Sequence, residues 1–180
     1  MKTRTPTRPD ARSTRPHVAR VAALFAIAIT AACSNEPGAP DGRELVIIRG
    51  EHFYLEPAID PATRETGLGG RESIESDGGM IFAFPTPRVQ AFWMRNCLAD
   101  IDIAYLSETG RVMTMHAMKA EPPKRTGESD LAYSNRLTRY PSRFPSRFVV
   151  EVAGGTWDRI GLAEGDVISF DIEGLKARAR

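Results

Sequence analysis

The chain has 180 residues and carries 24 lysines and arginines against 23 aspartates and glutamates, a formal net charge of +1. This length suits one ordinary domain with its own hydrophobic core and is short for two. Six of the basic residues and one of the acids precede residue 33, so the remainder has 18 basic and 22 acidic side chains, a net charge of −4. This mildly acidic remainder argues against a nucleic-acid-binding protein, which needs an excess of Lys and Arg to displace counterions from phosphates.

The chain begins with the pattern of a secretory signal peptide. A basic stretch precedes residues 21–32, an uncharged apolar run of twelve residues. As a helix this run would extend about 18 Å, well short of the ~30 Å hydrocarbon core of a bilayer. We therefore predict that residues 1–32 are a cleaved signal peptide and not a transmembrane anchor.

The end of this segment, ITAAC at residues 29–33, resembles the bacterial lipobox, in which cleavage precedes the cysteine and its thiol receives diacylglycerol. The resemblance implies that Cys33 is lipidated and holds the protein on a membrane, because several buried acyl chains make a lasting anchor. Ser34 stands where an aspartate would favour inner-membrane retention. We therefore expect a periplasm-facing protein of the cell envelope, at the outer membrane. The alternative is ordinary cleavage nearby, with Cys33 as a free thiol.

Cysteine content limits the covalent and metal chemistry of the folded part. Only Cys33 and Cys97 are present, so lipidation of the first would leave the second without a partner, and no disulfide framework or Cys-based metal site is expected. Residues 33–43 are polar and contain Pro and Gly, which predicts a lipidated cysteine followed by a flexible tether. We place the folded domain at residues 44–175 and a short tail at 176–180.

Short apolar runs between turn residues predict a predominantly β, α+β domain. The Ser-Glu-Thr-Gly sequence at 107–110 predicts a hairpin turn. One short helix is expected to begin after Asp60 and end at Gly67, and a second to cover residues 156–161. The predicted strands cover residues 45–49, 53–58, 80–84, 92–95, 101–106, 112–117, 148–152 and 167–172.

Residues 119–145 predict a long loop. They include four prolines, and Lys and Arg outnumber Asp and Glu. Loops of this length within a compact domain are usually functional or disordered. A lid, a partner-binding arm and an electrostatic contact to anionic lipid or acidic polymer are the alternatives.

Several motifs together resemble the bacterial and archaeal domain of unknown function 192 (DUF192), over roughly residues 45–173. The resemblance implies a compact, β-rich, barrel-like α+β domain, commonly exported, and it implies no established activity. Together with the hairpin and the two short helices predicted above, we expect an antiparallel sheet. The motifs, in chain order, are RETGL at 64–68 with Arg71, GMIFAFP at 79–85, FWMRN at 92–96 with Asp102 and Ile103, YPS at 140–142 and GLAEGD at 161–166.

Hydrogen-bond donors in these motifs are the candidate ligand-binding residues. Arg64, Arg71, Arg95 and Asn96 carry donors that suit a carboxylate, a phosphate or an acidic sugar. The alternative is that the arginines cover the ends of the sheet and bind backbone carbonyl groups. Asp102 lies close to Arg95 in sequence and completes this candidate surface.

Acid–base chemistry is the second possibility. Asp102 follows Asp100 at a spacing of two, so both carboxylates would share one face of a strand. His116 lies on the next predicted strand and is the candidate partner of Asp102 in catalysis. The alternatives are that Asp102 fixes a turn or pairs with Arg95, and that His116 is simply packed. The sequence has no zinc-binding His spacing, no nucleophile elbow and no phosphate-binding glycine loop, so no metal and no cofactor is expected.

These observations favour a membrane-tethered binding or accessory module of the bacterial cell envelope, with an unknown envelope ligand or protein as its partner and no nucleic acid. The alternative is an envelope hydrolase that uses Asp102 with His116.

Overall fold

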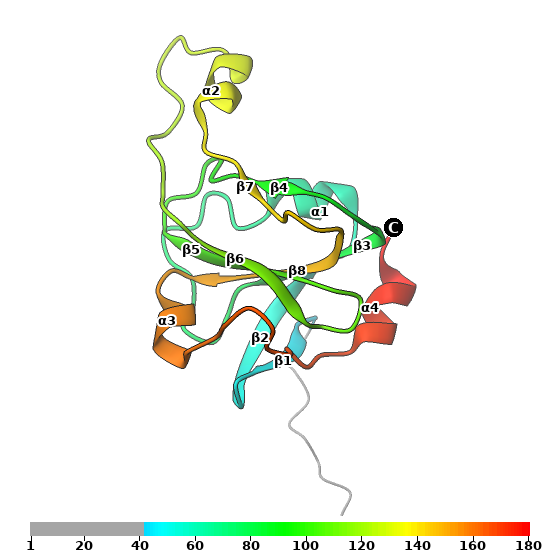
Figure 1. The fold of residues 1–180 in the computed structure, drawn as a ribbon. Helices are drawn as coiled ribbons and strands as arrows, with labels where there is room; N and C mark the ends of the chain where they lie inside the picture. The colour runs from blue at the N-terminus through cyan, green and yellow to red at the C-terminus, as the bar shows by residue number, and fades with distance from the viewer. Residues whose placement is uncertain (1–41) are drawn as a thin grey trace, which may run out of the picture. The chain divides into compact units, whose positions relative to one another are not determined.

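The computed structural model describes residues 42–180, and its elements are labelled in Figure 1. The predicted signal peptide, the lipidated Cys33 and the tether up to residue 41 lie outside the described residues. In chain order the elements are β1 (Glu44–Ile48), β2 (Glu51–Ala58), α1 (Pro61–Thr66), β3 (Met80–Arg88), β4 (Ala91–Phe92), β5 (Ile101–Leu106), β6 (Val112–Met118), α2 (Asp130–Arg136), β7 (Tyr140–Pro141), β8 (Ser146–Ala153), α3 (Thr156–Ile160) and α4 (Ile172–Arg178).

Six strands form the main sheet in the order β1-β2-β3-β8-β5-β6, and β4 pairs with β7 in a separate two-stranded sheet. This confirms a sheet-rich α+β fold. The main sheet is antiparallel as predicted at every strand pair except one, since β2 and β3 pair in parallel. The chain between these two strands contains α1 and returns to the end at which β2 began, as a parallel connection requires.

The sheet is not closed into a barrel, which corrects the barrel-like expectation. β1 and β6 are the two edges of the sheet. The chain near residue 168 lies between these edges but makes only isolated bridges, Ile47 with Ser169 and Arg111 with Val167. These two bridges do not make a strand, so the strand predicted at 167–172 is wrong. Its last residues instead begin the helix α4, where the Asp171 side chain accepts a hydrogen bond from the Gly174 N–H.

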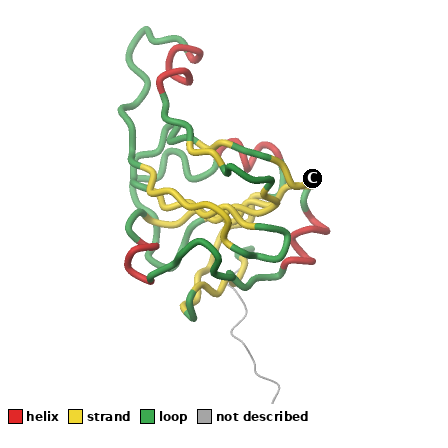
Figure 2. Tube along the Cα trace, viewed as in Figure 1, coloured by secondary structure: helices red, strands yellow, loops and turns green. Residues whose placement is uncertain are grey.

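The described residues contain four short helices, two more than predicted. The predicted helix after Asp60 is confirmed as α1, because the Asp60 side chain accepts from the Thr63 N–H and Pro61 occupies the first turn. The predicted helix at 156–161 is α3. The additional helices are α4 and α2, which lies inside the predicted basic loop. In Figures 1 and 2 this loop extends away from the main sheet and carries α2 at its far end.

Each face of the main sheet carries its own hydrophobic layer, because successive side chains of a strand point to opposite faces. The first layer packs against Trp157 of α3 and Leu175 of α4, and we call this side the α3 face. The second layer packs against Leu68, Met94 and Cys97, which follow α1 and β4, and we call it the α1 face. On β3, Ile81 belongs to the α3 face and Phe82 to the α1 face.

Candidate functional site

A cleft of about 460 Å³ opens on the α1 face. It lies between α1, the strands β3 and β4, and the chain that follows β4. A cleft of this size is in the range of small-molecule sites in proteins. Its lining residues are Pro61, Arg64, Glu65, Thr66, Gly67, Leu68, Gly69, Phe82, Phe84, Arg88, Gln90, Ala91, Phe92, Trp93, Arg95, Cys97 and Glu151.

Aromatic side chains make up much of the wall. Phe82 and Phe84 point into the cleft because they alternate with Ile81 and Ala83 on β3. The Phe92 ring packs edge-on against Phe82, with 5.0 Å between the ring centroids. Trp93 follows it and leaves 38% of its surface exposed. The wall therefore offers ring faces and edges to an apolar ligand.

Glu151 is a buried carboxyl group in this lining. It lies in the middle of β8, between Met80 of β3 and Ile103 of β5, and only 5% of its surface is exposed. The hydrogen bonds among residues 42–180 include none to its side chain. Burial raises the pKa of Glu151 from 4.5 to about 8, so the carboxyl group is mostly protonated and neutral at pH 7. It presents a hydrogen-bond donor to the cleft.

Gly79, just before β3, allows β8 to approach closely at Glu151. Gly79 has φ of 141°, and a Cβ atom at this position would lie 2.1 Å from the main-chain oxygen of Glu151. Any side chain would push β8 away from β3. The glycine of the GMIFAFP motif therefore has a packing role beside the cleft.

Cys97 and Tyr105 are buried on the same face, and Glu151 contributes to the pKa shifts of both. Burial, with a smaller contribution from Glu151, raises the pKa of the Cys97 thiol to about 11. Burial also raises the pKa of the Tyr105 hydroxyl above its usual value, and this hydroxyl donates to the main-chain oxygen of Tyr140 at 2.5 Å. A thiol that stays protonated is a poor nucleophile, so Cys97 is an apolar part of the wall.

Two arginines share one aromatic ring at the cleft. The guanidinium carbons of Arg64 and Arg88 each lie 5.0 Å from the centroid of Phe84. Arg64 donates to the main-chain oxygens of Ala83 and Arg180, at 3.0 and 2.7 Å. Burial and then the charge of Arg88 lower its pKa. Arg88 has no ion pair and no side-chain hydrogen bond within the described part of the chain, so its guanidinium is free to bind a ligand.

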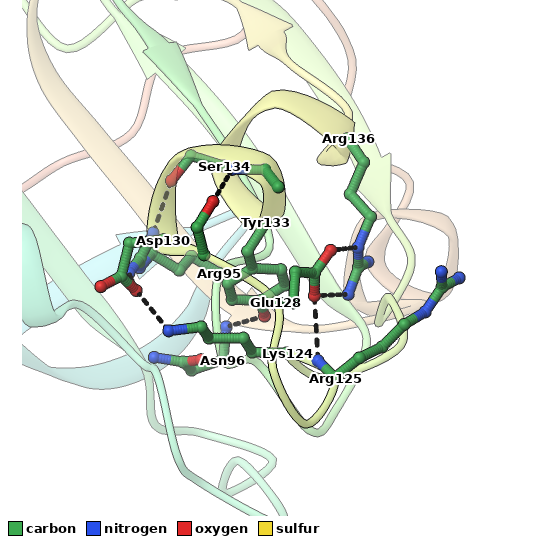
Figure 3. Close-up of polar contacts among 11 residues, drawn as sticks. Arg95, Asn96, Lys124, Arg125, Glu128, Asp130, Tyr133, Ser134 and Arg136 are labelled. Atoms are coloured by element: carbon green, nitrogen blue, oxygen red, sulfur yellow. Dashed lines mark hydrogen bonds and ion pairs between the residues drawn. The ribbon is translucent and has the colours of Figure 1, made fainter.

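Arg95 and Asn96 hold the loop that carries α2 (Figure 3). Arg95 donates to Ser134 Oγ at 2.6 Å and to Asp130 at 2.9 Å, and stacks on the Tyr133 ring at 5.3 Å. Asn96 adopts a left-handed backbone with φ of 57°, and its N–H donates to the Tyr133 hydroxyl at 3.0 Å. Arg95 therefore lines the cleft while its head group is already paired.

Two ion pairs within this loop offset part of its basic charge, Arg136 with Glu128 and Lys124 with Asp130. Tyr133 is 1% exposed and is covered on its other side by Arg136, 4.7 Å from the ring centroid. Hydrogen bonds from Arg136 and from the Arg125 N–H lower the pKa of Glu128 to about 2. Lys124 pairs with Asp130 at 3.1 Å (Figure 3). The loop is thus an ordered arm built around Tyr133.

Arg71 lies outside the cleft lining. Its guanidinium donates to both carboxylate oxygens of Glu56, at 2.6 and 2.7 Å. The hydrogen bond from Arg71 lowers the pKa of Glu56. This bidentate pair joins the chain after α1 to β2, so Arg71 has a structural role.

Asp102 and His116 lie on opposite faces of the sheet. Asp102 is paired in register with Ala117, whereas His116 is paired with Ile103. Asp102 is 2% exposed and accepts a hydrogen bond from the Trp157 N–H at 2.8 Å on the α3 face. The His116 ring Nε2 lies 2.9 Å from the main-chain oxygen of Pro141 on the α1 face. The two side chains therefore do not form one acid–base site.

Metal-ligand geometry is absent from the described residues, where no group of three or more His, Cys, Asp or Glu side chains is placed to hold an ion. Residues 42–180 also contain no helix that is long and apolar enough to cross a membrane.

Comparison with known proteins agrees with the motifs. Residues 45–170 match the family described as Uncharacterized ACR, DUF192. The chain belongs to the DUF192 family. No curated protein shows significant similarity to it.

Two solved structures are similar to this DUF192 chain, each with a TM-score of 0.58. One is a candidate transcription regulator from Sinorhizobium meliloti 1021, 28% identical, with the match covering 72% of this chain and 93% of that one. The other is a protein of unknown function from Novosphingobium aromaticivorans DSM 12444, 29% identical, with 71% and 83% covered.

Of the predicted site residues in this DUF192 domain, only Arg64 and Arg95 line the cleft. Sequence reasoning missed Glu151, Arg88 and Trp93. One pattern pointed to Glu151, because it is the single charged residue in the apolar run at 148–152. A lone charge within a buried strand marks a functional candidate. Arg88 carries no such pattern, since it lies at the exposed end of β3.

Proposed function

We propose that this DUF192 domain is a ligand-binding module of the bacterial cell envelope, tethered through a lipid on Cys33, and that its ligand occupies the cleft on the α1 face. One observation carries the proposal. Glu151 places a buried carboxyl group without a hydrogen-bond partner in the lining of an aromatic cleft.

This arrangement is costly unless something completes it. Glu151 has no side-chain hydrogen bond among the described residues and borders the cleft, so a ligand bound there can pair with it. Glutamate in the middle of a central strand also replaces an apolar side chain that would pack better. A ligand with an acceptor atom would satisfy the carboxyl group, and perturbed acids in clefts are typical of functional sites.

The proposed surface differs from the one expected from sequence. Arg64 and Arg95 remain in it, because both line the cleft. Arg71 is paired with Glu56, and neither Arg71 nor Asn96 is part of the cleft lining. Asp102 lies on the opposite face of the sheet.

The binding proposal is tested by a thermal-shift screen of the purified protein against peptidoglycan fragments, acidic sugars, nucleotides and aromatic acids. A ligand at a hundredfold excess over its Kd raises apparent stability by ~2.7 kcal/mol. We expect at least one such ligand, with its affinity reduced tenfold or more in Glu151→Leu, which removes the hydrogen-bond donor, and unchanged in Arg71→Gln, whose position is outside the cleft. Equal effects of the two substitutions, or no stabilising ligand, would reject the cleft as the functional site.

The tether is tested separately in cells. Growth with an alkyne-labelled palmitate should label the wild-type protein and place it in the membrane fraction. Cys33→Ser should lose both the label and membrane association. A soluble, unlabelled wild-type protein would reject the anchor and leave the binding proposal standing.

A further inference from the structure

We infer that the ligand of this cleft is a small organic anion with a flat apolar body, whose acidic group is bound by Arg88 and Arg64 while Glu151 donates a hydrogen bond to the ligand. This assignment rests on the proposed function, since it names the class of ligand that the cleft takes.

The acidic group is assigned from the two guanidinium groups beside Phe84. Like charges held near one ring repel each other, and burial, followed by the charge of Arg88, lowers the pKa of Arg64. Neither forms an ion pair with an acidic side chain in the described residues, and Arg88 has no side-chain hydrogen bond there. Arg64 already uses two of its five N–H donors on the main-chain oxygens of Ala83 and Arg180. An anion would relieve the repulsion and gain charge-assisted hydrogen bonds from Arg88 and from the remaining donors of Arg64.

The flat apolar body is assigned from the walls. Phe82, Phe84 and Phe92 present rings to the cleft, and Trp93 adds the part of its indole that is not covered by Arg139, whose guanidinium lies 3.5 Å from the ring centroid. A planar ring system stacks favourably on such surfaces. The volume of about 460 Å³ accommodates one small ligand of this kind.

Glu151 favours an acceptor atom over a cationic group. In its neutral form the carboxyl O–H donates a hydrogen bond and adds no negative charge to the cleft. The charged side chains that line the cleft are Arg64, Arg88, Arg95 and Glu65, three positive against one negative. A cation would meet a positive rim with no buried counter-charge.

The same residues make anion binding dependent on pH. When Glu151 loses its proton it loses its donor and repels an anion, so affinity should fall as pH rises through about 8. Cys97 and Tyr105 lie near Glu151, and burial raises the pKa values of both, that of Cys97 to about 11. His116 lies on the same face beside Tyr105, so the comparison with Glu151→Gln isolates the change that comes from Glu151.

The test is isothermal titration calorimetry of the purified protein with three probes that share one ring system: 2-naphthoate, 2-naphthyl phosphate and the neutral 2-naphthalenemethanol. We expect both anions to bind at least tenfold more tightly than the alcohol at pH 6. Arg88→Gln should remove this preference, while Arg71→Gln should retain it. The affinity for 2-naphthoate should fall at least fivefold from pH 6 to pH 9 in the wild type and stay constant in Glu151→Gln.

The outcomes separate the ligand class from the proposed function. Binding of all three probes with equal affinity would overturn the anion assignment and leave the cleft as a ligand site. Binding of neither anion would also overturn it, and the wider thermal-shift screen would then decide on the proposed function alone. Preference for the phosphate over the carboxylate, or the reverse, identifies the acidic group within the proposed class.

Discussion

Replacing Glu151 with glutamine should stabilise the domain by on the order of 4 kcal/mol more at pH 9 than near pH 5, where it should change stability little. The pKa of Glu151 is about 8 in the folded state and 4.5 for an unburied glutamate. Between these values the folded state binds one proton more than the unfolded state, so the free energy of unfolding falls as pH rises, by at most ~1.4 kcal/mol per pH unit. Glutamine has a similar shape and no charge, so it avoids this loss.

Urea denaturation at pH 5, 7 and 9 measures the difference between wild type and variant. The control is Glu65→Gln, which neutralises an exposed glutamate at the rim of the same cleft and should change stability by less than about 0.5 kcal/mol at every pH. A constant difference between wild type and Glu151→Gln across the three pH values would show that Glu151 titrates normally. The donor role assigned to it would then be wrong.

The strands were the part of the fold most readily predicted from sequence. Apolar runs such as those of β5 and β8 leave few alternatives once turn residues bound them, and Gly110, with φ of 78°, forms the predicted hairpin turn after Ser107. The strand expected at 167–172 failed for a local reason. Asp171 can end a strand or cap a helix, and only the packing of Leu175 into the core decides for the helix.

The open sheet could not be predicted in the same way. Closure depends on whether the chain near residue 168 pairs along its length with both β1 and β6. That is a property of two distant edges, and the pattern of residues within one strand does not report it. The helix α2 was hidden for a similar reason, because it is stabilised by Arg95 and Asn96, which lie more than thirty residues away.

The candidate site was predicted in part. Motif arginines indicated the right region, since Arg64 and Arg95 both line the cleft. Their spacing in sequence does not show which guanidinium groups are already paired, and Arg71 proved to be bound to Glu56. Asp102 and His116 were expected to face each other because their strands are adjacent. The strands pair with a register in which His116 lies opposite Ile103, one residue from Asp102, and this offset places the two side chains on opposite faces of the sheet.

Replacing Asp102 with alanine should lower the free energy of unfolding by about 2–3 kcal/mol. The Asp102 carboxylate accepts the Trp157 N–H at 2.8 Å and is almost completely buried. The helix α3 needs this acceptor from outside, since its N-cap residue is Gly155, which has no side chain to supply one. Hydrogen bonds to charged groups contribute about 1.5–3 kcal/mol, and removal of the carboxylate leaves a buried donor unsatisfied.

Denaturant unfolding of Asp102→Ala and Asp102→Asn distinguishes a structural carboxylate from a catalytic one. Asparagine retains an oxygen that can accept from Trp157, so it should lose less stability than alanine. The control is Asp100→Asn, which removes an exposed pair with Lys119 and should cost at most about 1 kcal/mol. If Asp102→Ala unfolded like the wild type, the carboxylate would not be the cap of α3. Asp102 would then be free for chemistry, and an envelope hydrolase would have to act on the α3 face without His116.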